Sequence, residues 1–162
     1  MVLVPGALAL LPEYASLEDP VAGLRAACLE AVGWLGADVT VLADAQGTRV
    51  AAHLLASTTR AGDEPSYLAV GNGSACRSEK APGFLDEGSF GFDAGLAEAL
   101  TTPDPAALAG IDPTRSAALL ASTDGIRALG DVLTPAHVAT VDYDDDPYGV
   151  QYWVVRWASR IP

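Results

Sequence analysis

The stretch VGNGSACRSEKAPGFLDEGSFGFDA, residues 70–94, decides how we expect this chain to fold. It is the one segment in which polar, charged, glycine and proline residues interrupt an alanine- and leucine-rich sequence for more than a dozen positions. An apolar run, residues 67–70, enters it, and an apolar-periodic segment, residues 90–100, leaves it. Open α/β proteins often form a site at the carboxyl edge of the sheet. The chain there has the same order of elements: a strand, a glycine-rich turn, a charged loop and a helix. The stretch therefore predicts a site whose candidate binding residues are Asn72, Ser74, Arg77, Glu79 and Lys80.

The rest of the chain alternates between strand and helix patterns. Short apolar runs rich in β-branched residues predict strands, and apolar positions that recur every three or four residues predict helices. We expect strands at residues 2–11, 38–44, 66–70, 139–143 and 149–157, and helices at 21–35, 50–55, 90–100, 106–109, 114–121 and 126–133. Asp112 followed by Pro113 is typical of a helix N-cap with proline in the first helical position. This order predicts a single α/β domain, residues 1–162: a three-layer α/β/α sandwich with a mostly parallel, mixed central sheet whose closing strand pair is antiparallel.

The composition excludes several classes of function. Half of the 162 residues are apolar and 19% are charged, which is typical of a globular protein. A formal net charge of −12 repels phosphate backbones and anionic lipids, so we expect no nucleic acid and no membrane as partner. The apolar start has no positive flank, since the first basic residue is Arg25, and it is too short to span a bilayer. Two cysteines, Cys28 in a helical pattern and Cys76 in the polar loop, give no disulfide framework, so we expect a cytoplasmic protein.

The charged part of the loop, residues 77–80, has two interpretations. In the functional one, Arg77 and Lys80 form a local positive pocket for a carboxylate or phenolate, and Glu79 sets their geometry. In the structural one, which we favour, the same charges solvate the loop and hold it through salt bridges. Tyr148, in the turn Asp-Pro-Tyr-Gly near the C-terminus, is likewise first a turn residue and second a candidate pocket wall.

The sequence offers few candidate ligands for a metal ion. A catalytic iron or zinc site needs about three protein ligands, commonly histidines and a carboxylate. The chain has two histidines, His53 in a helical pattern and His137 after a proline-broken turn, and neither has another histidine or glutamate at ligand spacing. We therefore expect no metal cofactor, and we interpret both histidines as surface or capping residues.

Two blocks of the sequence resemble a known family. The segment GNGSACRSEKAPGFLDEGSFGFDAGLAEAL and the ending DYDDDPYGVQYWVVRW are similar to the subunit-B-like proteins of the class III extradiol ring-cleavage dioxygenase superfamily, in particular to a small actinobacterial-type branch. The resemblance covers residues 66–101 and 139–157 and continues more weakly at the N-terminal strand and first helix. It implies an α/β/α sandwich and, in active members, a non-haem Fe²⁺ that cleaves catechol-type rings with dioxygen.

The positions that carry this chemistry differ in the present chain. The resemblance implies an iron-ligating histidine just after the first strand, where this sequence has Gly6. It implies a second histidine after the second strand, where residues 43–47 read ADAQG, and an acid–base histidine after a later strand, where residues 71–74 read GNGS. Two imidazoles and a carboxylate on one face are what Fe²⁺ needs, so the resemblance predicts an inherited fold without the iron site.

The leading hypothesis is therefore a catalytically degenerate dioxygenase-like domain that binds a small ligand or a partner through the loop after the third strand. One alternative is an active Fe²⁺-dependent oxygenase in which His53 and His137 converge with an acidic residue. Another is a structural subunit that forms a homo-oligomer or a larger assembly through the aromatic strand, residues 152–157, which is apolar on both faces.

Overall fold

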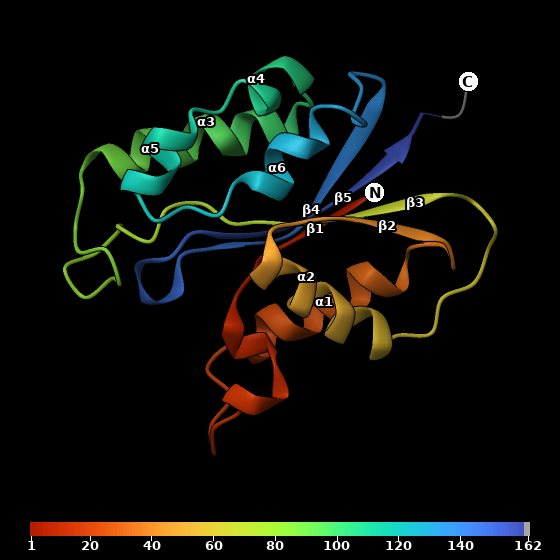
Figure 1. The fold of residues 1–162 in the computed structure, drawn as a ribbon, viewed down its shortest axis with the longest axis horizontal. Coiled ribbons are helices and arrows are strands. Elements are labelled where there is room, and N and C mark those ends of the chain that lie inside the picture. The colour runs from red at the N-terminus through yellow and green to blue at the C-terminus, as the bar shows by residue number, and fades with distance from the viewer. Residues whose placement is uncertain (161–162) are drawn as a thin grey trace.

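The computed structural model describes residues 1–160, and it has the α/β sandwich architecture expected from the sequence. The last two residues of the predicted domain, 161–162, lie outside the described part. Helices cover both faces of one central sheet, with α1 and α2 on one side and α3 to α6 on the other (Figure 1). None of the helices in residues 1–160 has both the length and the apolar character needed to cross a membrane.

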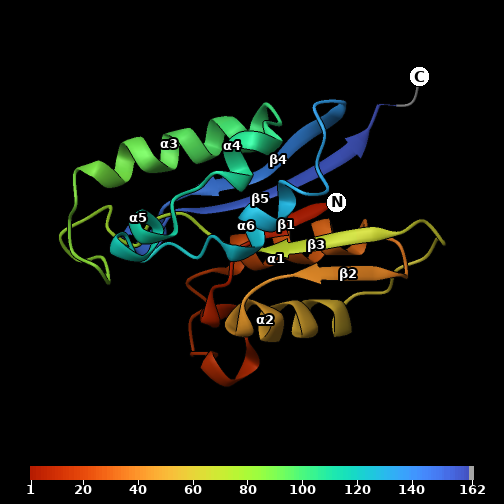
Figure 2. The same ribbon diagram turned by 45° about the horizontal axis from the view of Figure 1, so that its top comes forward.

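The sheet has five strands in the order β2-β3-β1-β5-β4. They are β1 (Val2–Val4), β2 (Val39–Leu42), β3 (Ser66–Val70), β4 (His137–Asp145) and β5 (Tyr152–Ser159). The first three run parallel, β5 runs antiparallel to β1, and β4 pairs antiparallel with β5. The parallel first strands and the antiparallel closing pair are both confirmed, and Figure 2 shows the strands side by side.

The helices form two groups that belong to two cores. The helices α1 (Ala22–Gly33) and α2 (Ala45–Ala56) pack with Val2, Val4, Leu68, Val70 and Val154 on one face of the sheet. On the opposite face Leu3, Ala69, Trp153, Val155 and Trp157 pack under α3 (Gly88–Thr101), α4 (Pro105–Ala109) and α6 (Asp124–Leu129). Helix α5 (Pro113–Ala118) lies on the same side of the sheet (Figure 1). Neighbouring residues of each strand point to opposite faces, so both cores share the same strands.

Several predicted boundaries are wrong. The first strand ends at Val4 rather than at residue 11, because the apolar residues that follow form a 3-10 turn, Leu8–Leu10, which buries Leu10 against the first core outside the sheet. Helix α2 begins at Ala45 rather than near residue 50, because the Asp44 carboxylate caps it by accepting a hydrogen bond of 2.7 Å from the Gly47 N–H. The predicted cap at Asp112 is confirmed, since its carboxylate accepts from the Thr114 N–H at 2.9 Å.

The two indoles of the aromatic strand, residues 152–157, are buried inside the chain. Strand β5 lies between β1 and β4, and its indoles Trp153 and Trp157 are 2% and 1% exposed in the core under α3. The prediction of an interface on residues 152–157 is therefore wrong for these side chains: the strand is apolar on both faces because both faces are covered within the chain. The edges of the sheet are β2 and β4.

Candidate functional site

The glycine-rich stretch after β3 is an extended, buried segment and not an open loop. Residues 71–76 are all buried, and their backbone pairs on two sides. On one side Asn72 exchanges backbone hydrogen bonds with Ser122, at 2.9 and 3.2 Å. On the other side the Gly73 N–H donates to the Gln151 carbonyl at 3.0 Å, and the Gln151 N–H donates to the Ser74 carbonyl at 2.9 Å. The stretch thus continues β3 between two later parts of the chain, and most of its backbone groups are satisfied by protein partners.

Glycine is required at position 73 because other groups approach its backbone closely. A Cβ there would lie 2.5 Å from Asp93 Oδ1 and 2.9 Å from the Gln151 Cβ, both shorter than any ordinary contact. The absent side chain leaves the space in which a carboxylate from α3 reaches the segment. Gly73 therefore serves the packing of Asp93.

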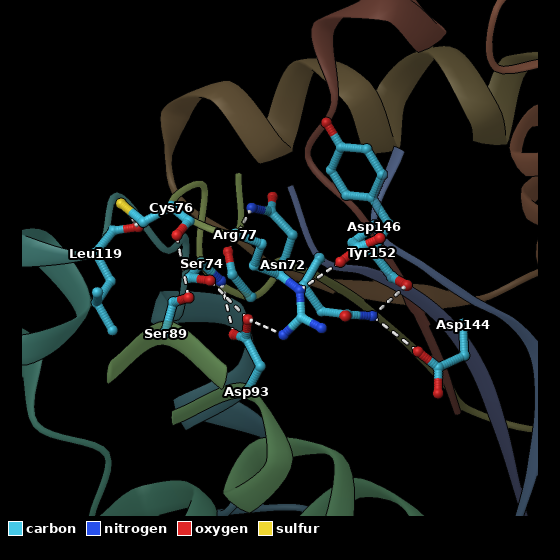
Figure 3. A network of polar contacts seen from close by, with 12 residues as sticks. Asn72, Ser74, Cys76, Arg77, Ser89, Asp93, Leu119, Asp144, Asp146 and Tyr152 are labelled. Carbon is cyan, nitrogen blue, oxygen red and sulfur yellow. Dashed lines mark hydrogen bonds and ion pairs between the residues drawn. The ribbon is translucent and has the colours of Figure 1, made fainter. Parts of the chain in front are cut away.

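Asp93 is the centre of a polar network that the sequence did not predict (Figure 3). This residue of α3 is 2% exposed, and its carboxylate accepts from the Ser74 N–H at 2.8 Å and from the Ser74 hydroxyl at 2.6 Å. It also accepts from Arg77 Nη1 at 3.0 Å. Three donors on a buried carboxylate, one of them charged, compensate for its removal from water. One signal was present in the sequence: Asp93 precedes the buried Leu96 and Leu100 by three and seven residues and so lies on the apolar face of its helix.

Arg77 is a paired cation and not the free one expected for an anion pocket. Its Nε donates to Asp146 Oδ2 at 2.7 Å, and its guanidinium lies 4.7 Å from the centre of the Phe90 ring. Burial acts to lower the pKa of Arg77, but the hydrogen bonds that it donates to Asp146 and Asp93 outweigh this effect, and the pKa is raised. The guanidinium is thus permanently charged and already neutralised by two carboxylates. Its Nη2 makes no hydrogen bond to any residue in 1–160.

The remaining predicted site residues divide between the interior and the surface. Asn72 is 8% exposed and donates from Nδ2 to the Gly73 carbonyl at 3.1 Å. Glu79 and Lys80 are exposed on the outer part of the loop, and neither takes part in a salt bridge within residues 1–160. The prediction that Glu79 orients Arg77 is wrong, because Asp93 and Asp146 do so. Tyr148 is exposed as well, in a 3-10 turn (Pro147–Gly149).

Gly6 lies where the resemblance places an iron-ligating histidine, and polar amides surround it. The Gln46 side chain donates to the Gly6 carbonyl at 2.7 Å. A Cβ at position 6 would lie 3.7 Å from Asn72 Oδ1, an ordinary contact distance. This position is therefore covered by Gln46 and Asn72, whose amides are poor substitutes for imidazole toward Fe²⁺.

The residues do not fit a resident iron ion. Within residues 1–160 no three His, Cys, Asp or Glu side chains group so that they could hold a metal ion. His53 lies in α2, which packs on β2 and β3, whereas His137 begins β4 at the far edge of the sheet. His137 Nδ1 lies 3.0 Å from the Thr134 N–H, which donates to it. The hypothesis that the two histidines converge is wrong.

A pocket of about 200 Å³ lies against the network. Its polar wall comes from Arg77, Asp93, Asp144 and Gln151, and its apolar wall from Phe90, Trp153 and two alanines of α3. The Gln151 amide donates to Asp144 Oδ1 at 2.8 Å, while Gln151 Oε1 accepts no hydrogen bond from residues 1–160. The pocket therefore offers Arg77 Nη2 as a donor and Gln151 Oε1 as an acceptor, both without a protein partner. Trp153, on its apolar wall, has a buried Nε1 that also makes no hydrogen bond within residues 1–160.

Three hollows elsewhere are larger than this pocket. One of about 310 Å³ lies between α3 and residues 107–115, and no buried charged side chain lines it. The other two are also chemically poorer. One of about 470 Å³ lies between α3 and α4, and one of about 300 Å³ lies beside the 3-10 turns that follow β1. Neither is lined by a buried charged side chain. In the second, Arg25 donates to Asp19 and to the carbonyls of Ala9 and Leu10, so its donors are used by the protein.

Comparison with known proteins gives no relative: no family model, no curated protein and no solved structure matches the chain. The resemblance to the extradiol dioxygenases consequently stays a prediction from the sequence blocks.

Proposed function

We propose that this chain is a catalytically degenerate, extradiol-dioxygenase-like domain that binds a small neutral molecule in the pocket beside Arg77. The observation that carries the proposal is the pair of unpartnered polar atoms, Arg77 Nη2 and Gln151 Oε1, at one half-apolar pocket. Pockets with a few converging polar groups and an otherwise apolar wall are typical of small-molecule sites.

The charges and the walls restrict the class of ligand. Asp93 and Asp146 already compensate Arg77, and Asp144 adds another carboxylate, so an anionic ligand would be repelled. The ligand we expect accepts a hydrogen bond from Arg77 Nη2, donates one to Gln151 Oε1 and places a planar apolar part against Phe90 and Trp153. Phenols, catechols and small aromatic amides have this chemistry.

The degenerate character rests on the donor set. Gly6 replaces the histidine that the resemblance implies, and the two histidines of the chain lie on distant elements. An oxygenase using His53 and His137 is accordingly not favoured. The two free, buried thiols, Cys28 and Cys76, fit the reducing cytoplasm in which we propose that the domain acts.

The binding test uses catechol as probe and a variant that fills the pocket without touching the polar network. Ala97 lines the pocket from α3, and we expect Ala97→Leu to weaken catechol binding at least tenfold, read as quenching of Trp fluorescence. Ala26→Leu, on the exposed side of α1, is the matched control and should bind as the parent does. Equal affinity of the two variants, or no saturable binding by the parent, would exclude the pocket.

The test of degeneracy is an anaerobic Fe²⁺ titration of the chelator-treated protein, with elemental analysis after desalting. We expect no retained iron. Retention of about one iron per chain would restore the oxygenase alternative and make ring cleavage of catechol the next assay.

A further inference from the structure

Three bulky residues occupy a backbone conformation that side chains avoid. Phe84, Leu120 and Tyr148 have φ values of 61°, 52° and 61°, and they are the only non-glycine residues in 1–160 with positive φ. All three are exposed, to 63%, 53% and 63%. Large side chains are rare in the left-handed region because the Cβ approaches the backbone, and glycine or asparagine normally takes such positions.

The three residues lie on loops that touch one another. A Cβ on Gly83 would lie 3.1 Å from Leu120 Cδ1, which places Leu120 beside the residue that precedes Phe84. A Cβ on Gly149 would lie 2.6 Å from the Ala81 Cβ, and the Phe84 N–H donates to the Ala81 carbonyl at 2.9 Å. The loops before α3, after α5 and between β4 and β5 meet at the same end of the molecule (Figures 1 and 2).

Folding does not account for these side chains. Each is more than half exposed, so it gains little burial in return for its backbone strain. Strained residues in native proteins concentrate at functional positions, where the surrounding structure holds them. Large apolar side chains gathered at one end of a protein indicate an interaction surface.

The charges around this surface indicate what it can bind. Glu79, Glu87 and Asp145 are exposed within five residues of Phe84 or Tyr148, and Asp86 is paired with Arg115 at 3.7 Å. Lys80 is the one basic residue of the loop 78–87. A second copy of the chain would bring the same acidic rim, and a net charge of −12, against this one, so self-association is disfavoured. A basic partner is attracted.

We call the surface formed by Phe84, Leu120 and Tyr148 the apical surface. We propose that it binds a basic segment of a partner protein, and that this segment presents a large apolar side chain between lysines or arginines. The apolar anchor contacts the three exposed side chains, and the flanking cations lie against the acidic rim. This surface is distinct from the pocket between Arg77 and Gln151, and its role does not depend on that pocket.

The test uses a synthetic twelve-residue peptide of Lys and Arg around a central Trp-Leu pair, labelled for fluorescence anisotropy. We expect saturable binding that weakens at least tenfold between 25 and 300 mM salt. We expect the triple variant Phe84→Gly, Leu120→Gly, Tyr148→Gly to bind at least tenfold more weakly while its melting temperature is equal to or higher than that of the parent, because glycine relieves the strain. Its catechol titration should be unchanged, which separates this inference from the proposed small-molecule site.

The control variant removes exposed apolar side chains elsewhere: Tyr14→Gly with Leu17→Gly, at positions 50% and 108% exposed near the first helix. It should bind the peptide as the parent does. Three outcomes would each overturn the proposal. The triple variant could bind the peptide as tightly as the parent does, or the parent could bind equally well a peptide with Glu in place of Lys and Arg. The parent could also form a dimer that the triple variant abolishes.

Discussion

At the scale of single residues, Asp93 is the polar side chain with the largest expected effect on stability. Its buried carboxylate compensates the Arg77 guanidinium at 3.0 Å and accepts two hydrogen bonds from Ser74. Asp93→Asn removes the charge and turns an NH₂ group toward these donors, and it leaves the partly buried Arg77 cation with weaker compensation. We expect the free energy of unfolding to fall by about 3 kcal/mol, measured by urea denaturation.

The control is the exposed ion pair between Arg49 and Glu13, whose side chains are 56% and 52% exposed. Glu13→Gln should change the free energy of unfolding by no more than about 0.5 kcal/mol, because solvent screens this pair. Similar losses for the two variants would mean that the network around Asp93 has no special role in the fold.

Residue-scale prediction from the sequence succeeded where the chemistry is local and failed where it is not. The sequence predicts salt bridges for Arg77, which the structure has. It also predicts that Cys28 is a buried hydrophobe, and in the structure burial raises the pKa of this thiol to about 12. The partners of Arg77 were missed, because Asp93 lies 16 residues away on α3 and Asp146 lies 69 residues away after β4. Nothing in local spacing joins these three side chains.

At the scale of elements, one glycine determines how α6 meets the sheet. A Cβ on Gly125 would overlap the carbonyl oxygens of Val70 and Leu42, the last residues of β3 and β2. We expect Gly125→Ala to lower the free energy of unfolding by about 2 kcal/mol, because either α6 or the strand ends must move. The matched control is Gly95→Ala in α3, where a Cβ meets no atom within 4 Å and the helix should gain about 0.5–1 kcal/mol. Urea denaturation of both variants checks the sign; a neutral Gly125→Ala would contradict the close approach.

Element boundaries were predictable where turn residues flank a β-rich run, and not elsewhere. Strand β3 has the predicted bounds, Ser66–Val70, because Pro65 and Gly71 delimit it. The predicted first strand is too long because Leu10 and Leu11 are buried in and just after a 3-10 turn, and periodicity does not distinguish such a turn from a strand. The segment 71–76 was interpreted as a loop because its composition is polar and glycine-rich, yet its partners, Ser122 and Gln151, are far along the chain.

At the scale of the whole molecule, the two cores depend on one pair of strands from opposite ends of the chain. Val2 pairs with Arg156 and Leu3 with Val155, so β1 joins the parallel half of the sheet to the antiparallel half. Neighbouring side chains of β1 enter different cores: Leu3 packs under α3, α4 and α6, and Val4 packs against α1 and α2. Damage to either core should therefore unfold both.

The substitutions Leu3→Ala and Val4→Ala test this coupling. Both side chains are fully buried, and we expect losses of about 3 and about 2 kcal/mol, respectively, in the free energy of unfolding. Far-UV circular dichroism reports both helix groups. In a Trp34→Phe background, which removes the third indole at the end of α1, the fluorescence of Trp153 and Trp157 reports the core under α3. If the chain is one cooperative domain, the two signals give the same urea midpoint in each variant. A Val4→Ala variant that shifts the dichroism midpoint but leaves the fluorescence midpoint in place would show that the two faces unfold separately, and the single domain predicted for residues 1–162 would have to be divided at the sheet.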